Sequence, residues 1–196
     1  MKKLLPKDAV LIPAEAKKVF AGEIFDVYQW PQKMFDGSTE TFEMLKRPDT
    51  VQILAVKDGK LVMVNDAQPN RGTQLHFPGG RVDDTDADWL AAARREMLEE
   101  TGCRFKNWRL IAVYQPAMKV EHFAAWFLAT DFASEQEPHL DNGEKIETVL
   151  YSFDDVKDKV MGADAVVSYA IPLFIKLNSL EDVLAQPEFT GQEAER

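Results

Sequence analysis

The alternation of apolar and polar residues predicts short strands at the start of the chain. Residues 18–29, with the sequence KVFAGEIFDVYQ, place apolar side chains at the spacing of a strand or a hairpin. Asp36 and Gly37 form a turn signal, and Phe42 and Met44 lie on the strand that follows. Two or three such strands would form a small antiparallel sheet, which is marginally stable alone. We therefore expect this sheet to pack against another element or against a second subunit.

A longer run of strands and one helix follow. VQILAV, the turn at Asp58-Gly59 and KLVMVNDA predict a hairpin, and WRLIAVYQPA, VEHFAAWFLATDF and ETVLYSF are three more strand candidates. After QLHFPGGRV, the pattern predicts an amphipathic helix from about Asp86 to Thr101. Gly102 is expected to end this helix as a C-cap.

The last third of the chain is predicted to be helical. FDDVKDKVMG begins with candidate caps at Ser152 and Asp154, and DAVVSYAIPLFIKLNSL is mostly apolar, with Pro172 at its start or at a kink. The order of strands, helix, strands and helices predicts an α/β fold with a mixed sheet between helices. The expected division is an N-terminal sheet region in residues 1–48, a main domain in residues 49–182 and a loose tail in residues 183–196.

Composition narrows the classes of function. The formal net charge of -10 argues against a nucleic-acid binder, because no basic stripe is available to replace counterions on phosphates. No apolar run reaches the roughly 18 residues of a membrane span, and charged residues and Pro6 interrupt the N-terminal apolar stretch before a signal peptide could form. Cys103, the single cysteine, excludes an internal disulfide and fits a reducing compartment. We expect a cytoplasmic protein without membrane or nucleic-acid partners.

Three carboxylates crowd the end of the predicted helix. Glu96, Glu99 and Glu100 are spaced so that all three converge on one side of it. A solvated acidic face, with Arg95 paired to Glu99, would explain this cluster at a cost of a few tenths of a kcal/mol for each like-charge pair. The upstream FPGGRVDD favours a metal site, because glycines admit close approach of the backbone and Mg²⁺ prefers oxygen ligands.

The segment GGRVDDTDADWLAAARREMLEETGC resembles the Nudix box, whose pattern is G-x5-E-x7-R-E-U-x-E-E-x-G-U with U an apolar residue. The first half departs from this pattern by one inserted residue after Gly80. Counting forward from Gly80 puts Asp86 at the position of the first glutamate. The second half matches completely, with Arg95, Glu96, Met97, Glu99, Glu100, Gly102 and Cys103 in place.

The resemblance implies a Nudix α/β/α sandwich that hydrolyses a nucleoside diphosphate linked to another moiety. It implies Mg²⁺, with Mn²⁺ as an alternative, as the cofactor. Bound metal would neutralise the diphosphate and lower the pKa of an attacking water. The implied metal ligands are Glu96, Glu100, Glu99 and the carbonyl of Gly80, and Arg95 would hold the glutamates by ion pairing.

Four segments outside the box resemble the ADP-ribose pyrophosphatase branch of the family: VFAGEIFDVYQW, FEMLKRPDTVQILAV, VNDAQPNRG and GEKIETVLYSFDDV. In that branch a small N-terminal sheet is packed or exchanged across a homodimer, and the general base is often a glutamate in the loop before a late strand. Glu144 in HLDNGEKIETV is the choice for this base, with Glu147, Asp141 or a glutamate of the box such as Glu99 as rivals. A polar turn of solvated acids is the alternative explanation of this loop.

Candidate substrate-binding residues complete the prediction. Arg71 could pair with a phosphate, as could Arg47 and Arg81, and Tyr28 and Trp30 could stack a base or belong to the core. Glu121 matches an acidic position that often helps to bind metal or ribose in the branch, and His122 is a structural or sugar-facing residue. GDP-mannose or another nucleotide is the alternative substrate. A non-catalytic nucleotide-binding module is the alternative class, which the three intact glutamates disfavour.

Overall fold

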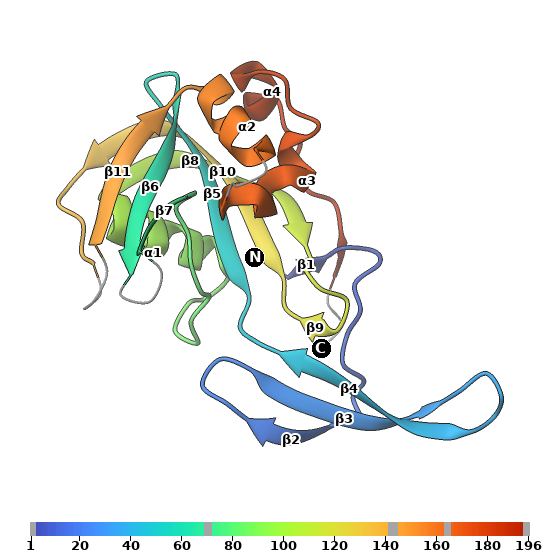
Figure 1. Ribbon diagram of the computed structural model, residues 1–196. Coiled ribbons are helices and arrows are strands. Elements are labelled where there is room, and N and C mark those ends of the chain that lie inside the picture. The colour runs from blue at the N-terminus through green and yellow to red at the C-terminus, as the bar shows by residue number, and fades with distance from the viewer. Residues whose placement is uncertain (1–2, 69–71, 141–144, 163–165, 194–196) are drawn as a thin grey trace.

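The computed structural model describes residues 3–68, 72–140, 145–162 and 166–193 of the 196-residue chain (Figure 1). The main sheet is mixed, as the sequence predicted. Its strand order is β11-β6-β5-β10-β8, with β7 paired to β6, and only the β5–β10 pair is parallel within it. These strands are β5 (Thr50–Lys57), β6 (Lys60–Gln68), β7 (Gly72–His76), β8 (Cys103–Tyr114), β10 (Ala124–Glu135) and β11 (Lys145–Tyr151).

Helices cover both faces of this sheet because its strands are apolar on both sides. On β5, Val51 and Ile53 pack with α1 (Trp89–Thr101), whereas Leu54 packs with the C-terminal helices on the other face. The latter are α2 (Phe153–Met161), the 3-10 helix η1 (Val166–Ala170), α3 (Ile171–Phe174) and α4 (Leu180–Leu184). The predicted α/β sandwich is therefore confirmed. Among the helices of the described ranges, none has the length and apolar character needed to cross a membrane.

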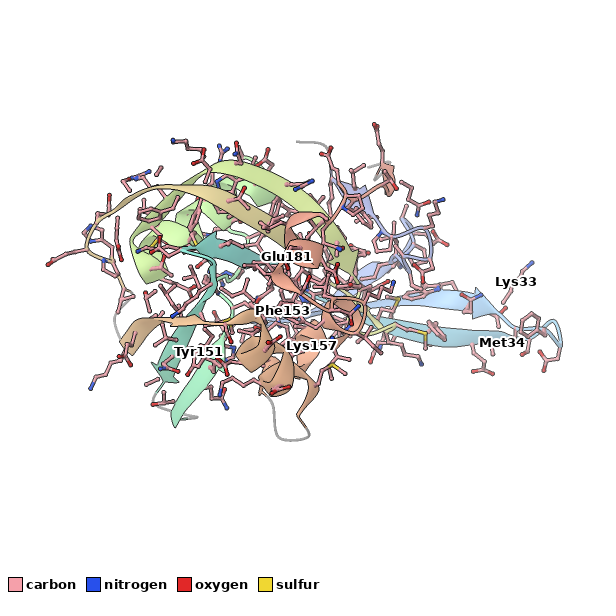
Figure 2. The ribbon with its side chains drawn as sticks, turned by 90° about the horizontal axis from the view of Figure 1, so that it is seen from above. Lys33, Met34, Tyr151, Phe153, Lys157 and Glu181 are labelled. Atoms are coloured by element: carbon pink, nitrogen blue, oxygen red, sulfur yellow. The ribbon has the colours of Figure 1, made fainter. Side chains whose placement is uncertain are left out.

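The N-terminal strands form a separate four-stranded sheet. Its order is β2 (Lys17–Ala21), β3 (Asp26–Lys33), β4 (Thr39–Lys46) and β9 (Val120–Glu121). Because β9 comes from the middle of the chain and pairs in parallel with β4, this sheet is anchored to the main domain. The β3–β4 hairpin extends far beyond the main sheet, with Lys33 and Met34 at its distal end (Figure 2).

The predicted element ends differ from the structure in three places. Helix α1 begins at Trp89, capped by Asp88, and not at Asp86. The long apolar helix expected after α2 is replaced by the short helices η1 and α3, with Pro172 in the first turn of α3, and α4 begins only at the last residue of the expected segment. The C-terminal segment is not loose up to residue 193, because Phe189 packs on the α1 side of the core and β12 (Gln192–Glu193) pairs with β1 (Leu4–Leu5).

Candidate active site

Helix α1 carries the acidic cluster and is held in place by its two caps and its buried face. Asp88 begins the helix by accepting a hydrogen bond from the backbone N–H of Ala91 at 2.8 Å. Gly102 ends it in the left-handed conformation, at φ +69°, and donates its N–H to the carbonyl of Leu98, as predicted. One face of the helix is buried through Ala92, Ala93 and Met97. The glutamates therefore face away from the core and toward the loop after β7.

This glycine loop, residues 77–81, runs along β5. Backbone N–H groups of Val51 and Ile53 donate to the carbonyls of Gly80 and Pro78, both at 2.9 Å. The N–H of Gly79 donates to Oε2 of Glu100 at 2.8 Å. At Gly80, an added Cβ would lie 2.6 Å from Oε1 of Glu96. The absence of side chains at these two positions lets the backbone contact the glutamates directly.

Substitutions at Gly79 and Gly80 should have different effects: one on the stability of the fold and the other on the geometry of the site. Gly79→Ala is expected to destabilise the protein by about 2–3 kcal/mol, because φ is +144° and the new Cβ would collide with the Val51 carbonyl. Gly80→Ala meets only the end of the flexible Glu96 side chain, so we expect hydrolysis to fall at least about 10-fold with a much smaller change in stability. Thermal melts and steady-state kinetics measure both effects. Equal destabilisation by the two substitutions would contradict this division.

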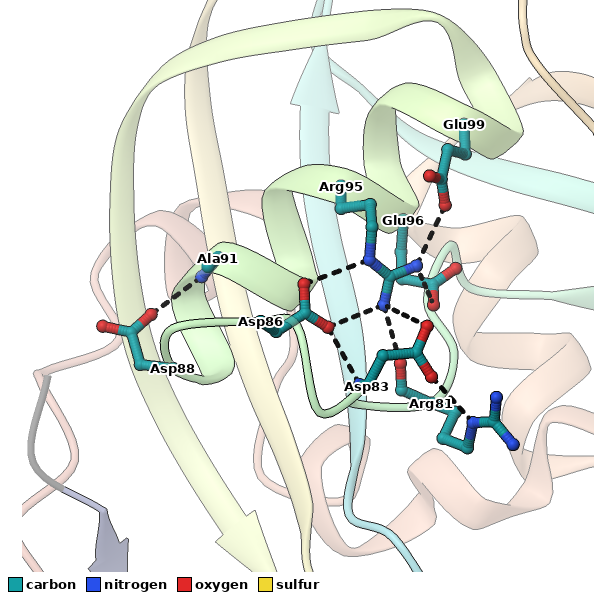
Figure 3. A network of polar contacts seen from close by, with 8 residues as sticks. All are labelled: Arg81, Asp83, Asp86, Asp88, Ala91, Arg95, Glu96 and Glu99. Atoms are coloured by element: carbon teal, nitrogen blue, oxygen red, sulfur yellow. Dashed lines mark hydrogen bonds and ion pairs between the residues drawn. The ribbon is translucent and has the colours of Figure 1, made fainter.

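Arg95 connects the acidic residues of the helix and the loop (Figure 3). Its Nη1 lies 2.9 Å from both Glu96 Oε1 and Glu99 Oε2. Its Nε and Nη2 donate to the two carboxylate oxygens of Asp86 at 3.1 and 2.8 Å, and Nη2 also donates to the carbonyl of Arg81 at 2.9 Å. The proximity of these carboxylates raises the pKa of the guanidinium above its ordinary value. Arg95 thus forms ion pairs with Glu96 and Glu99 from the same helix and with Asp86 from the loop.

Asp86 supports the site through Arg95. Its side chain is 6% exposed, it forms a two-point ion pair with Arg95, and it accepts a hydrogen bond from the N–H of Asp83 at 2.9 Å. The hydrogen bond from Arg95 holds the pKa of Asp86 below its usual range. The position that the sequence comparison offered as a substitute for the first glutamate therefore braces the inserted loop and the arginine. It does not lie among the residues that line the cavity.

Glu96 is an ionisable group in an unfavourable surrounding. Its side chain is 14% exposed, and burial raises its pKa from 4.5 to about 7 although Arg95 opposes this shift. A carboxylate that is costly to ionise in the metal-free protein would gain from a nearby cation. The oxygen-rich surroundings of Glu96 supply donors of the kind that a hard divalent cation prefers.

The raised pKa of Glu96 predicts how stability depends on pH in the metal-free protein. Protonation of Glu96 favours the folded state below about pH 4.5, and this contribution is lost as the pH rises through about 7. At 1.36 kcal/mol per pKa unit, the difference reaches about 3 kcal/mol. In EDTA, Glu96→Gln should therefore be more stable than the parent protein at pH 8, and the two should converge toward pH 4.5. Denaturant unfolding across this pH range measures the difference, and a constant offset would contradict the assignment.

A cavity of about 580 Å³ lies beside the cluster. The glycine loop, helix α1, β5, β6 and the end of β7 contribute to its walls, and Ile24 from the loop between β2 and β3 also lines it. Among its lining residues are Glu96, Glu99, Glu100, Gly80, Arg81, Arg47, His122, Gln52 and Tyr169. The same cavity is thus lined by carboxylates that could bind a cation, by arginines that could bind an anion, and by aromatic rings.

The structure separates the predicted substrate-binding residues into two groups. Arg81 lines the cavity, where its Nε pairs with Asp83 at 2.9 Å, and Arg47 lines it from the end of β4. Glu121 lies outside: its buried carboxylate pairs with Lys46 at 2.9 Å and accepts from the N–H of Ile12 at 2.7 Å. It therefore joins the N-terminal segment to the small sheet.

The two aromatic candidates of the small sheet also lie outside the cavity. Trp30 is 7% exposed and packs with Met44 and Ile12, and its ring lies 5.2 Å from that of Phe42. Tyr28 packs on the same cluster. In this chain both residues build the small core, which was the alternative explanation of their spacing.

The remaining predictions concern loops. Arg71, Glu144 and Asp141 lie outside the described residues. Glu147 is on β11 opposite Asn65, whose side-chain amide lies 3.5 Å from its carboxylate, and it does not line the cavity. His122 lines the cavity with Nδ1 2.9 Å from the carbonyl of Pro48, and burial lowers its pKa, which favours the neutral imidazole.

Sequence analysis did not identify Gln52 or Tyr169 as site residues. Gln52 interrupts the apolar run VQILAV, and that interruption was the available signal. Tyr169 gave no signal, because it lies in an apolar segment about 90 residues from the β7 end that it contacts.

The donor chemistry of the site fits a divalent cation. Glu96, Glu99, Glu100 and Gly80 line the same cavity, and their carboxylate and carbonyl groups are oxygen donors. In the arrangement described for residues 3–68, 72–140, 145–162 and 166–193, no three His, Cys, Asp or Glu side chains form a ready cation site. Arg95 is close to Glu96 and Glu99 instead. Cation binding would therefore require these carboxylates to share their charge between Arg95 and the metal.

The fold and the helix–loop site define a Nudix protein, and a family model for the NUDIX domain matches residues 46–170. The chain therefore belongs to the Nudix family, which confirms the resemblance of the box, and it is a hydrolase of that family. It is 28% identical over 162 residues to an ADP-ribose pyrophosphatase of Bacillus subtilis (strain 168), covering 79% of this chain and 87% of that protein. A crystal structure of an ADP compounds hydrolase shares its fold, with a TM-score of 0.70, 17% identity and coverage of 95% of this chain and 100% of the other. Nudix hydrolases generally use a divalent metal ion.

Proposed function

We propose that this enzyme hydrolyses the diphosphate bridge of ADP-ribose or a related nucleoside diphosphate sugar. Water would add to one phosphorus as the bridging P–O bond breaks, releasing a nucleoside monophosphate and a sugar phosphate. The cavity beside Glu96, Glu99 and Glu100 is the observation that carries this proposal. Its volume of about 580 Å³ falls in the usual range for small-molecule sites. The similarity to the Bacillus subtilis ADP-ribose pyrophosphatase supports this substrate class.

We propose Mg²⁺ as the metal, with Mn²⁺ as an alternative. Glu96, Glu99, Glu100 and the carbonyl of Gly80 would hold it. That carbonyl accepts a hydrogen bond from Val51 and keeps a second lone pair. When bound, the metal would neutralise the diphosphate and lower the pKa of the attacking water. Arg95 orients the carboxylates, and Arg81 and Arg47 offer positive charge to the substrate from other parts of the cavity wall.

A hydrolysis panel tests the function. It contains ADP-ribose, GDP-mannose, UDP-glucose, NADH, dinucleoside polyphosphates and nucleoside triphosphates, each with Mg²⁺ and then with Mn²⁺. ADP-ribose is expected to give the highest kcat/KM, with AMP and ribose 5-phosphate as products. Preference for GDP-mannose would replace ADP-ribose as the substrate, and binding without turnover of any member would contradict the proposal.

We propose Glu144 as the general base that takes the proton from the attacking water. Glu144→Gln is expected to lower kcat by about 10²-fold or more with little change in KM, because general base catalysis acts on the transition state. Glu147→Gln is the matched control, since that carboxylate lies on β11 outside the cavity. A large loss in Glu147→Gln with a small one in Glu144→Gln would assign the base to Glu147.

We also propose that the protein is a homodimer that associates through its N-terminal sheet. All five residues of the edge strand β2 are exposed, and Val19 and Phe20 present apolar side chains there, with exposed Ile24 in the loop that follows. Sedimentation velocity should then give a species of twice the 22.2 kDa chain mass. A single species of 22.2 kDa at micromolar concentration would contradict the dimer.

A further inference from the structure

The cavity has a polar and aromatic wall that the carboxylates do not use. Gln52 on β5 and Tyr169 on η1 both line it. Gln52 has the same side-chain direction as Leu54, which packs with the C-terminal helices, whereas Val51 and Ile53 pack with α1. The amide therefore projects from the face of the sheet opposite to the glutamate helix.

The Gln52 side chain is held in a surrounding that leaves one polar atom unsatisfied. Its Oε1 is buried and has no hydrogen-bond partner among the described residues. Buried amide oxygens are nearly always paired, because an unpaired one forfeits its hydration without compensation. An unpaired amide at the wall of a ligand-sized cavity is suited to turn toward a ligand and accept a hydrogen bond from it.

Tyr169 supplies a fixed aromatic surface close to this amide. Its hydroxyl accepts a hydrogen bond from the N–H of Phe77 at 3.3 Å, and its ring lies 5.9 Å from that of Trp126 at an interplanar angle of 34°. Trp126 is the direct neighbour of Gln52 in the parallel β5–β10 ladder. Gln52 and Tyr169 are thus placed around the same indole. Tyr169 remains 39% exposed, so part of its ring is available for stacking.

We propose that Gln52 and Tyr169 form the subsite for the purine base of the substrate and select adenine. The inference rests on the proposed function and names the residues that read the nucleotide. The base stacks on the Tyr169 ring, the adenine amino group donates to Gln52 Oε1, and a neighbouring ring nitrogen accepts from the Gln52 amide N–H. Guanine offers two acceptors at the corresponding edge and leaves Oε1 unpaired. A phosphate group offers only acceptors and no proton for this oxygen.

Binding of ADP and GDP in EDTA tests the subsite independently of turnover. By isothermal titration calorimetry, Gln52→Met should raise the Kd for ADP about 10-fold and leave the Kd for GDP almost unchanged. Tyr169→Ala should weaken both nucleotides about 10- to 100-fold, because stacking is lost for either base, whereas Tyr169→Phe should retain the affinity of the parent protein within about 3-fold. Gln136→Ala is the matched control, since Gln136 is exposed and outside the cavity.

Thermal melts give a second readout for Gln52. Gln52→Met removes a buried unpaired oxygen from the ligand-free protein, so its Tm should equal or exceed that of the parent by about 2–4 °C while ADP binding weakens. A group with a purely structural role would lower the Tm on removal. Gln52→Ala serves as a second variant if Gln52→Met does not fold.

Several results would overturn the subsite. An unchanged Kd for ADP in both Gln52→Met and Tyr169→Ala would do so, as would equal weakening of ADP and GDP by Gln52→Met. If the Kd for ADP is unchanged in Gln52→Met and Tyr169→Ala but the ratio of kcat/KM for ADP-ribose to that for ADP-glucose changes, these residues contact the sugar attached to the second phosphate and not the base. If the parent protein shows the expected ADP binding but hydrolyses no member of the panel, the proposed function fails and the subsite stands. If the parent protein hydrolyses ADP-ribose but the variants show none of the expected changes in Kd, the proposed function stands and the subsite fails.

Discussion

Glu100→Gln is expected to reduce kcat/KM for ADP-ribose about 10³-fold while the free energy of unfolding changes by less than about 1 kcal/mol. The glutamine oxygen can still accept the hydrogen bond that Glu100 takes from the N–H of Gly79, so the glycine loop keeps its position. Only the negative charge is lost. Removal of a single preorganised electrostatic contact, such as one oxyanion-hole donor, costs roughly 10²- to 10³-fold in kcat, and loss of a proposed metal ligand should have an effect of at least this size.

Steady-state kinetics and Mg²⁺ titrations measure the effect of Glu100→Gln. The apparent Mg²⁺ affinity should fall together with kcat/KM, because the same charge acts on both. Glu135→Gln is the matched control: its carboxylate pairs with Lys57 on the surface, at 2.6 Å, and lies outside the cavity. Unchanged hydrolysis in Glu100→Gln would remove this residue from the site.

Arg95→Ala is expected to lower both stability and activity. Its removal leaves the carboxylates of Asp86 and Glu96, 6% and 14% exposed, without their main counter-charge. Breaking a buried ion pair on one side costs about 3–5 kcal/mol, and we expect about 3 kcal/mol here because Arg95 is 26% exposed. Activity should fall more than about 10²-fold, since Glu96 and Glu99 lose the group that orients them.

Mg²⁺ provides a specific check on the role of Arg95. A divalent cation should raise the Tm of Arg95→Ala more than that of the parent protein, because it supplies positive charge that the variant lacks. Arg95→Lys should recover part of the stability and less of the activity, since an ammonium group cannot make the two-point contact with Asp86. Arg104→Ala, at an exposed arginine bonded to Gln136, should leave the Tm and the activity unchanged. A Tm of Arg95→Ala equal to that of this control would contradict the role of Arg95 in connecting the acidic residues of the helix and the loop.

Local patterns predicted elements well where one interaction dominates. The Asp58-Gly59 turn between β5 and β6 was correct, because both residues adopt positive φ and glycine suits such a turn. The start of α1 was misplaced because DDTDAD offers several carboxylates for the cap. Asp86 is committed to Arg95, nine residues away, and Asp88 therefore caps the helix. Local sequence cannot distinguish among these acids.

The C-terminal segment illustrates a longer-range limit. Phe189 is a single aromatic residue in a polar tail, so its composition predicted a loose segment. In the fold its backbone N–H donates to the carbonyl of Leu110 at 2.8 Å, and β12 pairs with β1 from the other end of the chain. These contacts depend on the placement of distant strands, about which the tail itself carries no information.

The sequence by itself determined that Arg95, Glu96, Glu99 and Glu100 lie close together on one helix, because this depends only on helix geometry, and their spacing carries the resemblance to the Nudix box. The tertiary structure decided which other residues share the cavity. It brought Gln52 and Tyr169 together around Trp126, and it placed Glu121 and Trp30 in supporting contacts outside the cavity. The physical reason is that a side chain acquires its partners from strand pairing and packing between segments far apart in the chain, which short-range periodicity does not encode.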